Sequence, residues 1–130
     1  MLTLEEKITQ LLSPLVDNRV FWDTNDEGVP ITSTSPVIII EQAGGESDWY
    51  VEGALPSHRN ARLQISCWGK SRLVVNKLAR LVEATIAESG LVARPYGAFT
   101  AQYDDALKLR GTLQHFGIWY ADPVPTSTSP

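Results

Sequence analysis

Apolar residues recur at helical intervals near the start of the chain. The stripe consists of Leu4, Ile8, Leu11, Leu12 and Leu15. Thr3 and Glu6 have the spacing of a capping box, in which each side chain accepts a hydrogen bond from the other residue's backbone amide. Pro14 should end the regular helix, because it lacks a donor and restricts the residue before it. The pattern predicts an amphipathic helix from Thr3 to Pro14.

A second helical stripe follows Ser71, whose hydroxyl can cap a helix. The predicted buried positions are Val74, Leu78, Leu81, Val82 and Ile86. Lys77 and Arg80 fall on the opposite side, which predicts a solvent-facing surface there. Gly90 is expected to stop this helix.

Strand patterns fill much of the remainder. Residues 19–22 predict a short strand, and the mixed segment 23–35 predicts a long loop. The segment Val37–Gln42 is apolar on both faces, which is typical of a central strand. Gly44 and Gly45 can form a hairpin turn, so residues 48–52 are expected to return as the second strand of that pair.

The clearest alternation lies between residues 61 and 68. One face carries Ala61, Leu63, Ile65 and Cys67. The other face carries Arg62, Gln64, Ser66 and Trp68. This pattern predicts a strand that is covered on one side only.

The last third predicts a second hairpin, from residues 98–103 and 107–120 joined through Asp104, Asp105 and Ala106. Its second strand changes phase. Leu109 and Leu113 are at odd positions, which face one side of a strand, whereas Phe116, Ile118 and Tyr120 are at even positions, which face the other side. A bulge near Gly111 or Gly117 is expected to reconcile them.

The order of these elements predicts an α+β fold, with a mainly antiparallel β-sheet and two α-helices packed on one face. Residues 1–121 are expected to form a single domain, since 130 residues is the size of one domain. Residues 122–130 are rich in Pro, Ser and Thr and predict a flexible tail.

Charge and cysteine content exclude several partners. The net charge of −4 argues against sequence-specific nucleic-acid binding. Cys67 is the only cysteine, so the chain has no thiolate metal cage and no internal disulfide. The start of the chain has no apolar signal core, and the longest aliphatic run is too short to cross a bilayer. These features predict a soluble protein made in the cytoplasm, with no membrane partner.

Candidate catalytic groups are few. His58 and His115 fit surface or structural histidines better than general bases, and Cys67 lies in the apolar phase of its strand. Asp104 and Asp105 are adjacent, which favours a turn over an acid pair. We find no metal-ligand spacing and no phosphate-binding loop. The expectation is a protein without catalysis, cofactor or metal.

Aromatic and charged residues favour a protein–protein surface instead. Tyr50 and Trp68 lie on the polar sides of their strands, whereas Trp49 shares its phase with Val51 and fits core packing equally well. The candidate interface consists of Trp49, Tyr50, Glu52, Arg62, Gln64 and Trp68.

An ordered set of segments resembles a known family. Ser35-Pro36 precedes V-I-I-I-E-Q, which is followed by G-G-E-S-D-W-Y-V-E-G, A-R-L-Q-I-S-C-W-G and the helix start S-R-L-V-V-N-K-L-A. With the N-terminal amphipathic helix, this pattern over residues 2–120 resembles the tail-terminator, or tail-completion, proteins of long-tailed bacteriophages and prophages. Ser66 stands where the family would have an acidic residue.

The resemblance implies a structural protein of the virion tail that assembles in the host bacterial cytoplasm. Such a protein forms a homo-hexameric ring, caps the tail tube, ends its polymerisation and joins it to the head-completion complex. The implied partners are other copies of itself, the tail tube protein and the head-completion or connector protein, and DNA passes through the ring. The alternatives are another head–tail adaptor or tail-tube ring protein, or a small ligand-binding α+β domain.

The family pattern and the strand pattern together predict a head-to-tail contact between copies. Two helices cover only one face of a sheet, so the second apolar face of the Val37–Gln42 strand needs another cover. The contact is expected to join residues 48–52 to the face that bears Arg62, Gln64 and Trp68, with Arg62 meeting a carboxylate such as Glu52.

Overall fold

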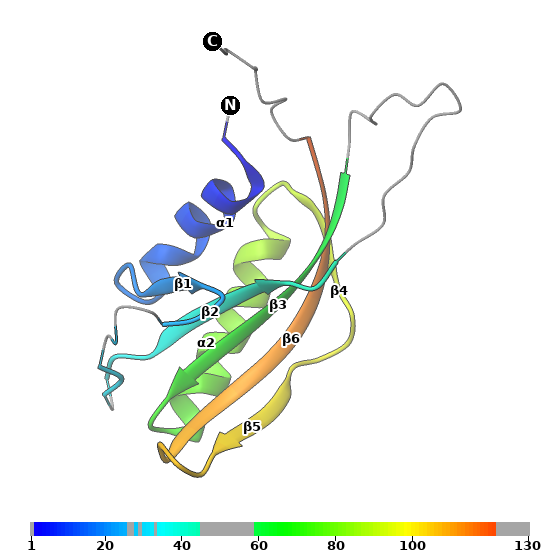
Figure 1. Ribbon diagram of the computed structural model, residues 1–130. Coiled ribbons are helices and arrows are strands. Elements are labelled where there is room, and N and C mark those ends of the chain that lie inside the picture. The colour runs from blue at the N-terminus through cyan, green and yellow to red at the C-terminus, as the bar shows by residue number, and fades with distance from the viewer. Residues whose placement is uncertain (1, 26–27, 29, 33, 45–58, 122–130) are drawn as a thin grey trace.

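The computed structural model describes residues 2–25, 28, 30–32, 34–44 and 59–121. Within these residues the chain forms two α-helices, a 3-10 turn and six strands (Figure 1). The elements in order are α1 (Leu4–Leu12), η1 (Ser13–Leu15), β1 (Val20–Trp22), β2 (Val37–Gln42), β3 (Arg59–Gly69), α2 (Arg72–Ala87), β4 (Val92–Pro95), β5 (Thr100–Asp104) and β6 (Leu109–Tyr120). The predicted α+β class is confirmed.

The strands form one mixed sheet in the order β1-β2-β3-β6-β4. β1 runs parallel to β2, and the other pairs are antiparallel. β4 and β5 follow one another along the same edge of β6, so that β4 pairs with residues 116–119 and β5 with residues 109–113. β6 is therefore paired on both edges along most of its length.

Both helices cover the same face of the sheet, as predicted (Figure 1). The predicted apolar face of β3, formed by Ala61, Leu63, Ile65 and Cys67, is at most 2% exposed. It packs in one core cluster with Ile8 of α1 and Val82 of α2. This side is called the covered face below, and the opposite side is called the open face.

α1 begins and ends where the sequence predicts. The Thr3 hydroxyl accepts a hydrogen bond from the Glu6 amide at 3.2 Å, and a Glu6 carboxylate oxygen accepts one from the Thr3 amide at 3.1 Å. The regular helix ends at Leu12, and Pro14 lies in η1. The predicted capping box and proline stop are confirmed.

α2 has its predicted Ser71 cap, but its buried stripe is shifted from the prediction. The buried residues are Val75, Leu78, Ala79, Val82 and Ile86. Val74 is only partly buried, and Leu81 is 42% exposed. The prediction favoured the larger Leu81, whereas the small side chain of Ala79 faces the core and lets the helix lie close to the sheet.

β6 contains no bulge opposite β3, so that prediction is wrong. The register with β3 is continuous from Arg59 opposite Tyr120 to Gly69 opposite Arg110. Thr112 and Gln114 lie on the covered face and are 1% and 3% exposed. Gln114 Nε2 donates to the Gly97 carbonyl at 2.9 Å, which satisfies a polar group on that face. The polar pair explains the apparent phase change, and Leu113 lies on the open face.

β4 was not predicted. It is four residues long, includes Arg94 and Pro95, and is mostly exposed, so it lacks an apolar alternation. Proline is tolerated there because β4 is an edge strand.

The sequence predicts that β2 pairs with a hairpin strand at residues 48–52, whereas in the structure β2 pairs with β1 and β3. β1 and β3 occupy both edges of β2 at residues 38–40. The predicted hairpin strand 48–52 and the predicted tail 122–130 lie outside the described residues.

Candidate functional site

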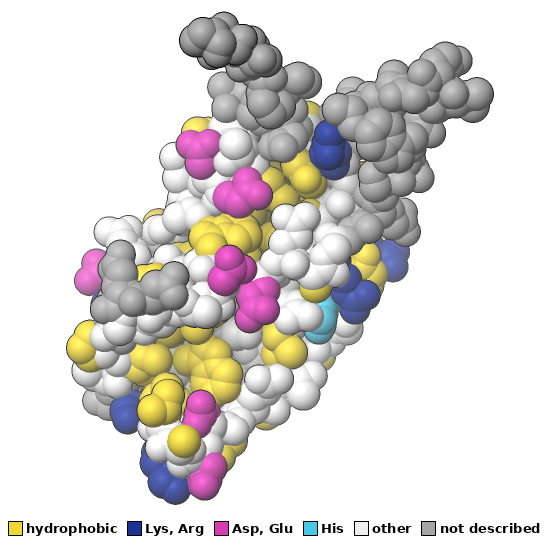
Figure 2. All heavy atoms as spheres, viewed as in Figure 1, with side chains coloured by type: hydrophobic (Ala, Val, Ile, Leu, Met, Phe, Trp, Pro, Cys, Tyr) yellow, Lys and Arg dark blue, Asp and Glu magenta, His cyan; other side chains and the backbone are white. Residues whose placement is uncertain are grey.

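The open face is built by alternate residues of the sheet strands, including β5, whose Gln102 and Asp104 lie opposite Gly111 and Leu109 of β6. It carries Val37, Ile39 and Glu41 of β2, Arg62, Gln64, Ser66 and Trp68 of β3, Gly111, Leu113, His115 and Gly117 of β6, and Arg94 of β4. Figure 2 views this face: apolar side chains gather in its lower part, acidic side chains lie in its middle and at the bottom, and Lys and Arg side chains lie at its right edge, at the lower left and at the bottom. No helix of the described chain covers this side.

A hollow of about 570 Å³ occupies the apolar part of the open face. Its apolar lining comes from Ile31, Ile39, Trp68, Leu107 and Leu113, and its polar lining from Asp23, Thr24, Asn25, Glu41, Gln64, Ser66, Gln102 and Asp104. The hollow therefore combines an apolar surface with a mainly acidic and amide rim.

Two aromatic rings on the open face lie against glycines of β6. A Cβ placed on Gly111 would lie 2.7 Å from Trp68 Cε3, and one placed on Gly117 would lie 2.6 Å from Tyr96 Oη. Such distances are shorter than real Cβ contacts, so each ring takes the space of a missing side chain. The two glycines thus let the rings lie flat on the sheet.

Tyr96 forms the centre of a cationic cluster. Arg62 Cζ lies 4.8 Å from the Tyr96 ring centroid, and Arg94 Cζ lies 5.4 Å from it. Both distances are within the range of a cation–π contact. We call these three residues the arginine–tyrosine stack.

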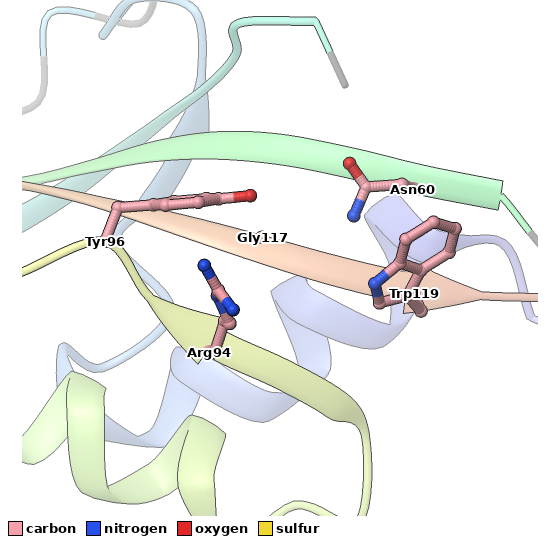
Figure 3. A pocket seen from close by; sticks show the side chains of 5 residues that line it. All are labelled: Asn60, Arg94, Tyr96, Gly117 and Trp119. Carbon is pink, nitrogen blue, oxygen red and sulfur yellow. The ribbon is translucent and has the colours of Figure 1, made fainter. Parts of the chain in front are cut away.

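A small pocket of about 180 Å³ adjoins the stack. In Figure 3, Tyr96 and Trp119 frame the space over Gly117, while Arg94 reaches in from β4 and Asn60 from β3. One guanidinium and a tyrosine hydroxyl therefore face a cavity large enough for one small anionic group.

Acidic residues lie near both edges of the open face: Glu41 and Asp23 lie toward the β1–β2 edge, and Asp104 lies on β5, which pairs with the same edge of β6 as β4. Glu41 belongs to β2 and is exposed, and Asp23 follows β1 and is also exposed. The ion pairs among the described residues join Arg19 to Asp17 and Lys108 to Asp105. Within that part of the chain, the stack has no carboxylate partner.

The candidate nucleophile is not available for chemistry. Cys67 is 1% exposed, and burial raises the pKa of its thiol to about 12, although a hydrogen bond with Thr112 acts in the opposite direction. A thiol with that pKa is protonated at neutral pH and is a weak nucleophile. Its predicted role as a small core residue is confirmed.

The acidic pair serves the turn between β5 and β6, as predicted. Asp104 Oδ1 accepts from the Leu107 amide at 3.0 Å, and Lys108 Nζ donates to Asp105 Oδ1 at 3.0 Å. Lys108 has a φ of 55°, which marks the tight end of the turn. These contacts give Asp104 and Asp105 a structural role in forming the turn.

His115 lies on the open face opposite Gln64. Its Nδ1 atom is buried and has no hydrogen-bond partner among the described residues. His58 lies outside the described residues.

No group of three or more His, Cys, Asp or Glu residues that could hold a metal ion occurs in the described part of the chain. Neither α1 nor α2, the helices that the structure describes, is long and apolar enough to span a membrane.

The structure brings together half of the predicted interface. Arg62, Gln64 and Trp68 share the open face, where Gln64 and Trp68 line the hollow and Arg62 joins the stack. Trp49, Tyr50 and Glu52 lie outside the described residues.

Sequence reasoning missed Arg94, Tyr96 and Leu113. The run R-P-Y-G at residues 94–97 places an arginine beside an aromatic residue, and that signal could have indicated a recognition site. Leu113 was assigned to a bulged strand and therefore to the wrong face.

No protein-family model matches the chain, and a search of the curated proteins finds no match either. The resemblance to tail terminators therefore rests on the sequence pattern alone. The open face is the feature from which a function can be inferred.

Proposed function

We propose that this protein is a tail terminator of a long-tailed bacteriophage or prophage. In this proposal, copies of the chain form a hexameric ring on the end of the tail tube. The ring ends polymerisation of the tube and presents its free side to the head-completion complex. It belongs to the virion tail, it is assembled in the host cytoplasm, and DNA passes through its centre.

The open face is the observation that carries the proposal. Ile38 and Ile40 of β2 are fully buried against the helices, while Ile39 lies on the open face and is only partly buried. Trp68 and Leu113 lie beside it in the hollow. A face that combines apolar side chains, aromatic rings and arginines has the composition of a protein interface.

The chemistry of the described residues supports a structural role over catalysis. Nucleophilic catalysis requires a nucleophile within hydrogen-bond reach of a base. Cys67 is buried and protonated, and the hydrogen bonds of Asp104 and Asp105 shape a turn. An assembly protein needs surfaces of defined shape and charge, which the open face provides.

Deletion of the gene from its phage genome tests the proposal. Without a terminator, tail tubes should grow to variable and excessive length and should not join heads, because nothing ends their polymerisation. Electron microscopy of lysates measures both. Complementation with the intact gene is the control, and it should restore uniform tails.

The same images distinguish related ring proteins. Loss of all tubes would indicate a tail-tube subunit, and normal tubes beside tail-less filled heads would indicate a head-side adaptor. Either result would contradict the terminator proposal. A monomer in dilute buffer would not, since the ring can form on the tail tip alone.

The hollow supports a second candidate function, the binding of a small ligand. Its volume of about 570 Å³ falls within the range of ligand sites, and Gln64, Ser66 and Gln102 offer polar contacts beside apolar ones. Ligand-induced stabilisation tests it: a compound that raises the melting temperature of the protein should lose that effect in Leu113→Asp. If no compound in a metabolite screen raises the melting temperature, the ligand-binding function is contradicted and the interface function is the one that stands.

A further inference from the structure

We infer that the arginine–tyrosine stack of one copy binds the Asp23 and Glu41 carboxylates of the next copy in the ring. The inference rests on the proposed ring and deepens it, because it names the charged contact between neighbours. It differs from the contact predicted from the sequence, in which Arg62 meets Glu52.

The stack is arranged in advance for a carboxylate. Tyr96 contacts the guanidinium groups of Arg62 and Arg94, which restricts their freedom before binding. A guanidinium group presents parallel N–H donors that match the two oxygens of a carboxylate. Two guanidinium groups on one ring therefore suit a pair of carboxylates.

Within a single described chain, these opposite charges do not pair with each other. Arg94 and Glu41 are separated by β3 and β6, which sets them roughly 14 Å apart at about 4.8 Å per strand. Glu41 lies opposite Gln64, two residues along β3 from Arg62, and the structure has no ion pair between them. Among the described residues, neither group has an ion-pair partner, so both can contact another molecule.

The position of the charges favours a head-to-tail contact. Asp23 and Glu41 lie toward the β1–β2 edge of the open face, and Arg94 lies on β4 at the opposite edge. Copies placed side by side in one direction bring Arg94 of one copy to Asp23 and Glu41 of the next, while Asp104 lies on β5, farther along the Arg94 edge. A two-fold arrangement of the same edges would bring like charges together, which is unfavourable.

A second copy fits the stack better than nucleic acid does. The chain has a net charge of −4, and Asp23, Glu41 and Asp104 all line the hollow of the same face. Phosphate backbones bind surfaces with many clustered cations, and these acids would repel them. The same acids provide the carboxylates that the stack requires.

Zero-length crosslinking tests the contact directly. Arg94→Lys keeps the positive charge and supplies an amine that a carbodiimide can join to a touching carboxylate. An equal mixture of isotopically heavy and light chains, examined by mass spectrometry in concentrated protein and in assembled tails, identifies links between copies. We expect heavy–light peptides that join residue 94 to Asp23 or Glu41.

The matched control adds Asp23→Asn and Glu41→Gln to Arg94→Lys, and it should lose these links. A head-to-tail contact should also yield a ladder of linked oligomers, because each copy offers one amine edge and one acid edge. A product that stops at the dimer would overturn the head-to-tail arrangement. The absence of these links in both samples would overturn the contact itself.

Charge exchange provides a second test that does not depend on crosslinking. A variant with Arg62→Glu and Arg94→Glu should associate roughly tenfold more weakly or worse, and so should one with Asp23→Lys and Glu41→Lys. A mixture of the two should recover association, because each reversed edge then meets its complement. No recovery in folded proteins would contradict the inference.

Tail length separates this inference from the proposed function. If the arginine variant folds and still produces tails of normal length, the contact is wrong while the terminator function stands. If deletion of the gene leaves tail length unchanged, the function is wrong whatever the crosslinks show.

Discussion

The two faces of the sheet are made by the same strands but carry different kinds of side chain. On the covered face, β3 presents Leu63 and Ile65, which are fully or almost fully buried under the helices. On the open face, the same strand presents Gln64 and Trp68, which are only partly buried. The covered face forms the hydrophobic core of the chain, whereas the open face carries aromatic and charged groups that pack against one another and stay partly exposed.

This contrast teaches which substitutions report on folding and which report on assembly. A residue on the covered face has its partners within the chain, so its loss lowers the free energy of unfolding. A residue on the open face has partners that the proposal assigns to other copies. Neighbouring positions on one strand can therefore give opposite results.

The largest effect is expected from Ile65→Asp. An unpaired carboxylate on the covered face costs several kcal/mol, which is comparable with the total stability of a domain. We expect an unfolded or aggregated protein by circular dichroism. The matched control is Gln64→Asp, one residue away on the open face, which should stay folded. A soluble, folded Ile65→Asp protein would contradict the assignment of the two faces.

The pKa and the reactivity of the Cys67 thiol should differ strongly between the folded and the unfolded chain. Burial raises the pKa of its thiol from 9.0 to about 12, so stability from the protonated thiol is fully present below pH 9 and is lost as the pH rises toward 12. Urea unfolding at increasing pH should show this loss, and Cys67→Ala should lack that part of it. A thiol reagent should react slowly with the native protein and rapidly in urea; equal rates would contradict the burial.

An intermediate effect is expected from Trp68→Ala on the open face. Under the ring proposal, the truncation should weaken assembly by about 1–3 kcal/mol per contact, because large buried rings dominate interfaces. Tail length and oligomer mass measure it, and circular dichroism should show a folded chain. The control is Leu73→Ala on α2, which removes an 81% exposed apolar side chain elsewhere and should assemble normally. Equal assembly of both variants would argue against the open face as the interface.

The smallest effect is expected at the beginning of α1, which covers part of the helix side. Thr3→Ala removes the hydroxyl that accepts from the Glu6 amide and should cost about 1 kcal/mol of stability. Thr3→Ser keeps the acceptor and should recover most of it. The Thr3 hydrogen bonds also lower the pKa of Glu6, so nuclear magnetic resonance titration should find that pKa closer to its ordinary value in Thr3→Ala.

The covered face could be predicted from the sequence to a large extent. The alternation from Ala61 to Cys67 and the capping box at Thr3 are local signals, and the structure confirms both. The buried stripe of α2 could not be predicted as well, because the choice between Ala79 and Leu81 depends on how closely the helix approaches the sheet. β6 was misread because Thr112 and Gln114 interrupt its apolar pattern while remaining buried.

The open face could be predicted only in part. Arg62, Gln64 and Trp68 share one strand, so their alternation places them together. Arg94 and Tyr96 join Arg62 through pairing with β6, which links residues far apart in the sequence. The stack also depends on Gly117, whose missing side chain makes room for the ring. Neither feature follows from a local pattern.

The position of β6 has a consequence for biosynthesis. This strand is the last one along the described chain, yet it lies between β3 on one edge and β4 and β5 on the other. While β6 is still inside the ribosome, β4 and β5 have no strand to pair with. The backbone groups on the edge of β3 that later pairs with β6 are also unpaired. Contacts between such distant segments form slowly. The sheet can therefore close only after translation of residue 120, and until then its unpaired strand edges are open to aggregation.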